Sequence, residues 1–491
     1  MGSEQESMSW ITGYIEGDNV SSDDDTPVGI INPSDGRRIA LLPSGTLRDV
    51  DLAVASARRA FDDGRWKDAT PTHRKATLYR FADLIDRHAQ ALDLLDAEEM
   101  GKPIAETAFN AVAAAALVRF YAECIDKITG DVFSSERRSL VLQRRVPRGV
   151  VAAVVPWNFP TYVAALKIAP ALAAANSVVL KPSELSSRSA IRLAQLASEA
   201  GIPPGVLNIV PGLGTTVGQA LALHHDVDML TFTGSTQVGR LMLQYAGQSN
   251  LKVVMAECGG KSPQILFADG VDIDAASESI ARSILTNQGQ VCSVGSRLLI
   301  QRSIETEVVE KIARHFAGAV IGAATDTKAT FGPVASVGQC DRVMQYIDVA
   351  HHAGALLVTG GKRTLERTGG YFIEPTIFRN VSPESRLARE EIFGPVLAVT
   401  SFGDEADAIR LANSTVYGLC AYVWTASLSR AMRVAKGIRS DVIVSSDAYG
   451  GEGAALAASW EPAGQSGFGT EGGVAGMESY LRRQLIGLQH A

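Results

Sequence analysis

Three side chains with catalytic potential stand in short motifs across the middle of the sequence. Cys292 lies among small and polar residues at the expected end of a helix, and Glu257 follows an apolar run and precedes Cys258 and two glycines. Asn158 lies between aromatic residues and prolines. A thiolate is a nucleophile, a carboxylate can act as a general base, and a rigid amide can donate to an oxyanion. Read singly, they also fit a buried thiol, an ion-paired carboxylate and a helix-capping amide.

Two glycine-containing turns are candidates for binding phosphate. In the first, Gly212 and Gly214 are followed by Gly218, a spacing that misses the dinucleotide fingerprint by one residue. The second, residues 232–239 (FTGSTQVG), follows an expected strand and opens an expected helix, whose N-terminal amides can bind a pyrophosphate. Each turn also fits an ordinary connection between a strand and a helix.

The periodicity between residues 150 and 255 predicts the elements that position these side chains. Short apolar runs alternate there with helical patterns, separated by Gly- and Pro-rich turns. This rhythm predicts a parallel sheet covered by helices on both faces, with ligands at the carboxyl ends of the strands. The expected strands are 150–155, 177–180, 206–210, 229–232 and 252–255, and the expected helices are 162–175, 187–200, 215–223 and 237–246.

The flanking segments have different patterns. Residues 3–27 are polar and acidic and are expected to form a partly loose lead-in, whereas alternation over 133–146 predicts an extended hairpin. A second α/β alternation runs from 259 past 440, loops are expected over 450–476, and 477–488 is expected to form a short helix or strand. Helical spacing covers three further segments, 50–62, 72–99 and 106–125.

Composition restricts the class of protein. With 491 residues, of which 46% are hydrophobic and 20% charged, the chain fits two or three globular domains. A net charge of −7 argues against nucleic-acid binding. The five cysteines form no CxxC pair, which excludes a disulfide framework and the usual zinc sites and predicts a cytoplasmic location without metal. The amino terminus has no apolar signal core and no apolar run could span a bilayer, so no membrane association is expected.

Together and in this order, the motifs resemble those of the aldehyde dehydrogenase superfamily, of the hydrolytic NAD(P)-dependent kind. The resemblance extends from about residue 30 to the carboxyl end. The matching signatures are 156–160 (PWNFP), 180–184 (LKPSE), 232–236 (FTGST), 257–261 (ECGGK), 289–292 (GQVC) and 390–395 (EEIFGP).

The resemblance implies an α/β fold of three parts. A Rossmann-type parallel-sheet domain for the dinucleotide would comprise residues 1–128 and 149–257, and a second α/β catalytic domain would comprise 258–450. A β-ribbon and the tail, 129–148 and 451–491, would pair between subunits of a homodimer or homotetramer. Oligomerisation has a physical motive here, because an exposed ribbon edge is prone to pairing unless it is covered.

The implied reaction is oxidation of an aldehyde to a carboxylic acid with NAD, or NADP, as hydride acceptor. Cys292 would attack the carbonyl to form a thiohemiacetal, while Asn158 and the Cys292 backbone amide would form the oxyanion hole. Glu257 would activate the water that hydrolyses the thioester. Lys167 and Glu471 fall where some relatives have a proton-exit path, although Lys167 fits equally well a helix lysine that extends its amine to solvent.

The same resemblance assigns contacts to the cofactor. The implied contacts are Lys181 and Glu184 at the adenosine ribose, Gly234, Ser235 and Gly239 at the pyrophosphate, Glu391 at the nicotinamide ribose, Phe393 at the nicotinamide, and Trp157 and Gly214 elsewhere in the cofactor site. Glu184 favours NAD, because a carboxylate accepts hydrogen bonds from a ribose 2′-hydroxyl and repels a 2′-phosphate.

The sequence departs from the family pattern beside the expected substrate tunnel. Cys258 replaces the usual leucine and is either an oxidation-sensitive thiol or a small apolar filler. Residues 459–465 (SWEPAGQ) replace the usual Pro-Phe-Gly-Gly-aromatic-Lys, and the loop 445–458 lacks the familiar asparagine. The resemblance therefore leaves the aldehyde open. Aromatic candidates for the tunnel lining favour an aromatic or medium-chain aldehyde: Trp157, Tyr162, Tyr449 and Trp460.

Other functions would use the same side chains. A thiol-dependent esterase or acyltransferase would need Cys292, Glu257 and Asn158, but neither the cofactor turn nor Glu391. A CoA-acylating relative would not need Glu257 to activate water. A catalytically idle binding protein is disfavoured because the set of three is complete.

Overall fold

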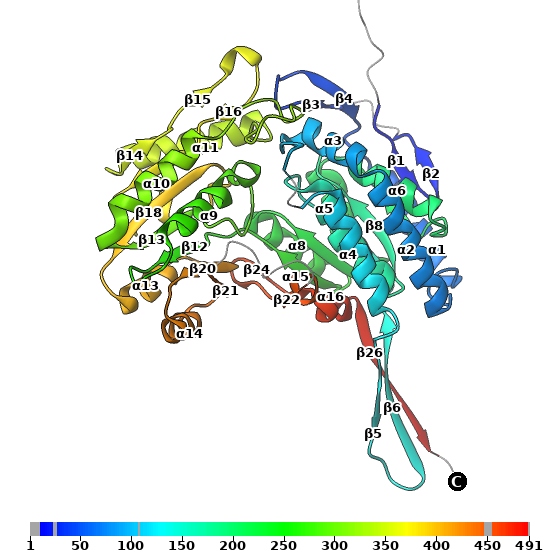
Figure 1. The fold of residues 1–491 in the computed structure, drawn as a ribbon. Helices are drawn as coiled ribbons and strands as arrows, with labels where there is room; N and C mark the ends of the chain where they lie inside the picture. Colours follow the sequence, from blue (N-terminus) through cyan, green and yellow to red (C-terminus); the bar gives the residue numbers. More distant parts are fainter. Residues whose placement is uncertain (1–9, 23–26, 107–108, 446–453, 490–491) are drawn as a thin grey trace, which may run out of the picture.

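The computed structural model describes residues 10–22, 27–106, 109–445 and 454–489. Figure 1 shows two α/β lobes side by side and a narrow ribbon that projects from one of them. This arrangement confirms the predicted α/β class. Among the described residues, no helix combines the length and apolar character that crossing a bilayer requires.

The first sheet has eight strands in the order β2-β1-β9-β8-β7-β10-β11-β24. The five strands from β9 to β11 run parallel, and β7 and β8 are buried along their whole length because helices cover both faces. The strands are β1 (Gly13–Ile15), β2 (Asp18–Val20), β7 (Val150–Val154), β8 (Ser177–Lys181), β9 (Leu207–Ile209), β10 (Met229–Thr233), β11 (Val253–Glu257) and β24 (Gly467–Phe468).

The predicted parallel sheet is thus correct for its centre and incomplete at its edges. The expected strands lie within two residues of the observed ones, but β1, β2 and β24 add antiparallel pairings that periodicity did not indicate. Strand β24 comes from the tail and pairs with β11 through Ala256–Phe468 and Glu257–Gly467.

The helices of this lobe largely match the expected ones. Two predictions need correction: the helix expected over 72–99 is broken at His88, whose ψ of 12° is not helical, and the helix expected from 106 begins only at Ala111, capped by Asn110. Apolar spacing continues across both points, so periodicity alone missed them. The helices are α1 (Leu47–Asp62), α2 (Pro71–Arg87), α3 (Ala89–Met100), α4 (Ala111–Cys124), α5 (Pro160–Ala173), α6 (Arg188–Glu199), η1 (Gly214–Gly218), α7 (Gln219–Leu223) and α8 (Thr236–Gln248).

The second lobe is built on a seven-stranded sheet in the order β14-β17-β18-β13-β12-β20-β21. All its pairings are parallel except that between β14 and β17. Its strands are β12 (Pro263–Leu266), β13 (Arg297–Gln301), β14 (Leu356–Thr359), β17 (Thr376–Arg379), β18 (Val396–Phe402), β20 (Cys420–Trp424) and β21 (Asp441–Val444). The main helices are α9 (Ile273–Leu285), α10 (Glu305–Ala317), α11 (Val337–His352), α13 (Glu405–Ala412) and α14 (Leu428–Gly437).

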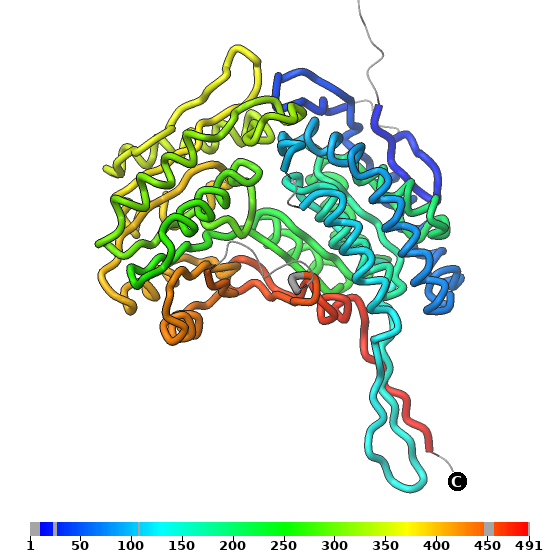
Figure 2. The backbone as a smooth tube through the Cα atoms, in the orientation of Figure 1, coloured from blue at the N-terminus to red at the C-terminus, as the bar shows by residue number. Residues whose placement is uncertain are grey.

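The projecting ribbon joins segments from opposite ends of the chain (Figures 1 and 2). Strand β6 (Ser139–Pro147) pairs with β5 (Asp131–Phe133) and with the carboxyl-terminal strand β26 (Leu481–Gln489). The hairpin predicted over 133–146 is therefore correct, and residues 477–488 hold the end of helix α16 (Gly473–Ser479) as well as a strand. The loops expected over 450–476 include short strand pairs in their described part, of which β22 (Ser459–Trp460) with β25 (Glu471–Gly472) is one.

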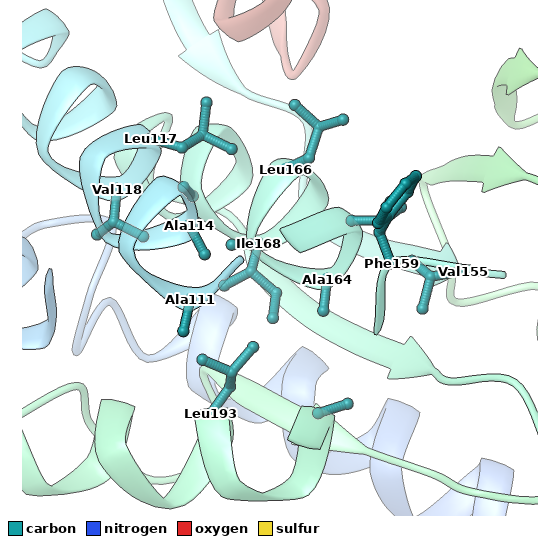
Figure 3. Close-up of a cluster of buried hydrophobic side chains, with 14 of the residues drawn as sticks. Ala111, Ala114, Leu117, Val118, Val155, Phe159, Ala164, Leu166, Ile168 and Leu193 are labelled. Atoms are coloured by element: carbon teal, nitrogen blue, oxygen red, sulfur yellow. The ribbon is translucent and has the colours of Figure 1, made fainter. Parts of the chain in front are cut away.

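A continuous apolar core fixes α5 between α4 and the first sheet (Figure 3). Small residues such as Ala114 and Ala164 lie where the two helices approach, which allows their backbones to come close. Ile168 and Phe159 complete the packing. This core holds the first turn of α5 and, directly before it, the loop that carries Asn158.

Candidate active site

The candidate residues gather at the carboxyl edge of the first sheet. Glu257 is the last residue of β11, Lys181 is the last residue of β8, and Gly234 directly follows β10. Asn158 lies in the loop between β7 and α5. Parallel strands end at one edge of a sheet, so side chains distant in sequence meet there.

Cys292 is held by a loop with a strained backbone. The loop follows the 3₁₀ turn η2 (Thr286–Gly289), in which Asn287 and Gln288 adopt φ values of 44° and 54°. Such left-handed conformations are costly for residues other than glycine and need support from their surroundings. That support comes from Glu106, whose carboxylate accepts a 2.9 Å hydrogen bond from the Asn287 backbone N–H.

Asn158 is tied to the same loop by two hydrogen bonds. Its Nδ2 donates to the carbonyl of Gln290 at 3.0 Å, and its own carbonyl accepts a 2.8 Å bond from Nδ2 of Asn287. The Asn158 side chain is therefore fixed two residues before Cys292 along the loop. A primary amide has a second N–H, which a developing oxyanion can use.

The Cys292 thiol lies in a desolvating and negatively charged environment. The residue is partly exposed, whereas the four other cysteines are buried. Desolvation of the thiol, together with the charges of Glu257 and Glu391, raises the pKa of Cys292 to about 12. A thiol with that pKa is protonated near neutral pH, so a base has to accept its proton before it attacks.

Glu257 is a buried carboxyl whose pKa is raised well above its usual value. Burial is the main cause and the charge of Glu471 adds to it, while Lys167 and a hydrogen bond with Trp460 act in the opposite direction. Its Oε1 has no protein hydrogen-bond partner among the described residues. A carboxylate with a raised pKa and a free oxygen is a stronger proton acceptor than an ordinary carboxylate.

Lys167 forms a buried ion pair with Glu471. Lys167 lies on α5, Glu471 lies on β25, and their side chains are 0% and 4% exposed. The alternative that Lys167 extends its amine to solvent is therefore wrong, because the packing of the tail over α5 encloses it. Trp460 pairs with Glu471 between β22 and β25, so the ion pair, Trp460 and Glu257 form one cluster.

The turn after β10 presents bare backbone at the start of α8. Ser235 caps the helix by accepting a hydrogen bond from the Val238 N–H at 3.3 Å. A Cβ on Gly234 would lie 2.6 Å from Cζ of Phe232, and one on Gly239 would lie 2.6 Å from Sγ of Cys258. A helix N-terminus without side chains in front of it can bind a phosphate.

Cys258 packs into this turn as a small core residue. It is 6% exposed and belongs to the apolar cluster beneath α8. Burial raises the pKa of its thiol to about 12, and the charges of Glu257 and Glu391 contribute. This environment favours the apolar filler over the oxidation-sensitive thiol, because reactive cysteines are exposed and ionised.

Glu391 and Phe393 lie on a loop that helix α11 holds by its backbone. Arg342 donates to the Glu391 carbonyl and Gln339 to the Phe393 carbonyl, each at 2.6 Å. The Glu391 carboxylate accepts the N–H of Gly260 at 3.0 Å. Phe393 has a φ of 61°, a strained conformation for an aromatic residue of the kind found at ligand sites.

The remaining predicted cofactor residues occupy several positions around this edge. Nζ of Lys181 lies 3.1 Å from Oε2 of Glu184, whose side chain is 38% exposed. The ring of Trp157 stands perpendicular to that of Phe393 with centroids 5.3 Å apart. Gly214 begins η1 with open space around it, and no hydrogen bond between it and the residues above is present in the described structure.

Aromatic side chains cluster beside α5. The ring of Phe109 lies 4.7 Å from that of Phe159 and 5.0 Å from that of Tyr162. Of the four predicted tunnel residues, Trp157, Tyr162 and Trp460 lie near the catalytic candidates, and Tyr449 lies outside the described residues.

Sequence reasoning missed Glu106, Asn287 and Gln290 as supports of the site. Gln290 accepts the Asn158 amide through its carbonyl, and its side-chain Oε1 accepts the Ala335 N–H at 2.9 Å. The sequence held a signal for Asn287 and Gln290, because amide side chains grouped in one short loop commonly hydrogen-bond to the backbone around them. Glu106 carried no such signal.

The chain is similar in sequence to known proteins. A family model described as "Aldehyde dehydrogenase family" matches residues 20–486. NADP/NAD-dependent aldehyde dehydrogenase PuuC of Escherichia coli is 43% identical over 428 residues, covering 87% of this chain and 86% of that protein. The aminoacetaldehyde dehydrogenase of Pseudomonas aeruginosa is 43% identical over 413 residues, with coverages of 84% and 82%.

Solved structures match over nearly the whole chain. The aldehyde dehydrogenase KauB from Pseudomonas aeruginosa superposes with a TM-score of 0.95 at 45% identity, covering 98% of this chain and 96% of that one. The indole-3-acetaldehyde dehydrogenase AldA of P. syringae, solved with NAD⁺ and IAA, also has a TM-score of 0.95, at 43% identity and with coverages of 98% and 97%.

Proposed function

The chain belongs to the aldehyde dehydrogenase family, and from that membership we propose which of its residues carry out the oxidation. The reaction converts an aldehyde to a carboxylic acid with NAD or NADP as acceptor. We assign the nucleophile to Cys292, the base to Glu257 and the oxyanion donor to Asn158. One observation carries this assignment: the 3.0 Å hydrogen bond that ties the Asn158 amide to Gln290, next to the Cys292 loop.

The residues of the sheet edge fit a nicotinamide dinucleotide. Gly234 and Gly239 let the start of α8 pack closely on Phe232 and Cys258. A pyrophosphate would bind at the N-terminus of that helix, and the partly exposed Glu184 would meet the adenosine ribose. Glu391 would hold the nicotinamide ribose beside Phe393. Bound NAD supplies the acceptor for the hydride that leaves the substrate carbon.

Cys292 would add to the aldehyde after its proton passes to a base. The sulfur–carbon bond forms as the carbonyl electrons move to oxygen, and the resulting oxyanion accepts the second N–H of Asn158. Glu257 is the carboxyl whose charge acts most strongly on the Cys292 thiol, which makes it the candidate for that proton.

After loss of the hydride the acyl group remains on Cys292 as a thioester. Glu257 would first release the thiol proton to solvent and then take a proton from water; the resulting hydroxide would attack the acyl carbon, and the thiolate would leave with the carbon–sulfur bond broken. The Lys167–Glu471 pair borders Glu257 and is our candidate for the route by which that proton departs.

We further propose an aromatic or medium-chain aldehyde as substrate. The cluster of Phe109, Phe159 and Tyr162 supports this, because aromatic rings favour contacts with other rings and with apolar chains. Trp460 extends the apolar surface toward Glu257. The match to an indole-3-acetaldehyde dehydrogenase is in line with that class.

The test is a panel of aliphatic, aromatic and ω-amino aldehydes, each assayed for reduced nicotinamide and for kcat/KM. We expect turnover that is abolished by Cys292→Ala and retained by Cys340→Ala, which alters a buried cysteine on α11. Ester hydrolysis without any reduced nicotinamide would instead identify a thiol esterase, and an acyl-CoA product would identify a CoA-acylating enzyme.

We also propose an oligomeric state, a domain division and a cellular location for the protein. The ribbon exposes Val132, Phe133, Leu485 and Leu488, which favours burial against a second subunit in a homodimer or homotetramer. We propose that the chain divides into a dinucleotide-binding domain, a catalytic domain and a ribbon with tail. The boundary of the catalytic domain at 450 lies outside the described residues. The free thiols favour a reducing compartment such as the cytoplasm.

A further inference from the structure

Two buried cations, Lys261 and Arg297, lie side by side between the strands of the second sheet and the loop that follows β11. Each residue is 2% exposed. Nε of Arg297 donates to the backbone carbonyl of Lys261 at 3.2 Å, so the guanidinium lies against the backbone of Lys261. Burying a charge is expensive unless an opposite charge or several hydrogen bonds compensate it.

The guanidinium of Arg297 is satisfied by neutral acceptors. Its NH groups donate to the carbonyls of Leu411 and Ala412 at 3.0 and 2.8 Å and to Oγ of Ser414 at 3.3 Å. These contacts satisfy its donors but do not neutralise its charge. In the described structure no carboxylate accepts a hydrogen bond from Arg297.

The ammonium of Lys261 has no hydrogen-bond partner among the described residues. Burial, together with the positive charge of Arg297, lowers the pKa of Lys261 to about 7. Glu391 and Glu390 act in the opposite direction through their charges, and so counter part of the penalty without accepting a hydrogen bond. A buried ammonium with three donors and no acceptor needs a ligand or loses its proton.

Lys261 and Arg297 line a cavity of about 10 Å³. That volume holds one water-sized sphere and is too small for a phosphate or an organic carboxylate. The lining is mostly polar and includes the exposed Arg439. The other polar residues of the lining are Ser262, Asn413, Thr415, Tyr417 and Ser440.

We propose that Lys261 and Arg297 bind one small monovalent anion of the chloride class in this cavity. The anion accepts hydrogen bonds from the unpartnered ammonium and neutralises part of two buried charges, which a water molecule cannot do. The site lies behind Gly260, whose N–H holds Glu391. It is separate from the acyl-transfer residues, and its occupancy can be tested without turnover.

The first experiment measures chloride binding to the purified full-length protein by the width of the ³⁵Cl NMR signal. The comparison uses Lys261→Met and, as a matched control, Lys252→Met, a buried lysine whose ammonium already donates to Ala222 and Ser249. We expect Lys261→Met to weaken binding about tenfold or more, because a hydrogen bond to a charged group contributes at least that factor. Lys252→Met should bind chloride like the wild type. Equal binding by all three proteins would overturn the proposal.

A second experiment does not depend on the folding of any variant. Crystals of the wild-type protein soaked in bromide should give an anomalous peak within hydrogen-bond distance of Nζ of Lys261. In solution, chloride should raise the Tm relative to gluconate at equal ionic strength, since gluconate is too large for the cavity. An ordered water at this position with no anomalous signal, or an equal Tm in both salts, would refute anion binding.

Discussion

The two groups that react in the proposed mechanism, the Cys292 thiol and the Glu257 carboxyl, both have pKa values raised by burial. The raised pKa has opposite consequences for the two groups. A raised pKa keeps the thiol protonated and makes it depend on a base, whereas it makes the carboxylate a stronger proton acceptor than an ordinary one. Desolvation thus weakens the nucleophile and suits the base.

Replacing Glu257 by Gln should separate the two halves of the reaction. The amide cannot accept a proton from water, so thioester hydrolysis should slow by about 10²- to 10⁴-fold. The first turnover should also slow near neutral pH, because Glu257 is our candidate for the Cys292 proton, but raising the pH ionises the thiol and should restore a burst of reduced nicotinamide in stopped-flow absorbance. If steady-state kcat stays within twofold of the wild type, Glu257 is not the base.

The acid limb of the kcat profile should report the ionisation of Glu257. The base must be deprotonated, so kcat rises as pH increases through the raised pKa of this carboxyl. Lys167→Met removes a charge that lowers that pKa, and the limb should move to higher pH. Lys167→Arg keeps the charge and should leave the limb near its wild-type position. A limb that is the same in both variants would contradict the coupling.

At the scale of elements, helix ends and loops carry the site. In the proposed cofactor site α8 would offer its N-terminus to the pyrophosphate, while α11 holds the loop of Glu391 through backbone carbonyls and α5 is fixed beneath Asn158 by the core. Sequence periodicity predicted α5 and α8 within a few residues, whereas α11 fell within a second α/β alternation whose elements were not predicted singly. It could not predict the break at His88 or the antiparallel edge strands, because apolar spacing records which face is buried and not which neighbour buries it.

Gly239→Ala tests the close packing of α8 on β11. Its new Cβ would lie 2.6 Å from Sγ of Cys258, so either the helix or the thiol must shift. We expect a loss of about 1–3 kcal/mol in the free energy of unfolding and a higher KM for NAD. Adding Cys258→Ala removes the sulfur and should restore most of both quantities, as measured by denaturant unfolding and initial rates. A double variant no better than Gly239→Ala would refute the steric explanation.

On the scale of the whole molecule, the carboxyl-terminal segment links parts that lie far apart along the chain. Its short strand β24 extends the first sheet, Glu471 reaches Lys167 on α5, and β26 completes the ribbon with β6. The segment expected to serve oligomerisation therefore also closes the active site around Glu257.

Removing residues 481–491 should abolish assembly and leave the catalytic lobes intact. The truncation deletes β26, which pairs with β6 along the whole ribbon. Light scattering after size exclusion should give two or four times 52.0 kDa for the wild type and slightly less than one such mass for the truncated chain. A monomeric wild type, or an unchanged truncated oligomer, would exclude the ribbon as the interface.

Local sequence patterns predicted the alternation of strands and helices, the sheet edge at which ligands are expected to bind, and Cys292, Glu257 and Asn158 as candidate catalytic residues. These follow from local periodicity and from residue types in short segments, which any chain with this pattern carries. The folded structure was needed to show that Lys167 is enclosed by Glu471, that Glu106 supports Asn287, and that the ammonium of Lys261 has no hydrogen-bond partner among the described residues. The physical reason is that burial and charge pairing depend on contacts between segments distant along the chain, and neither spacing nor composition contains those contacts.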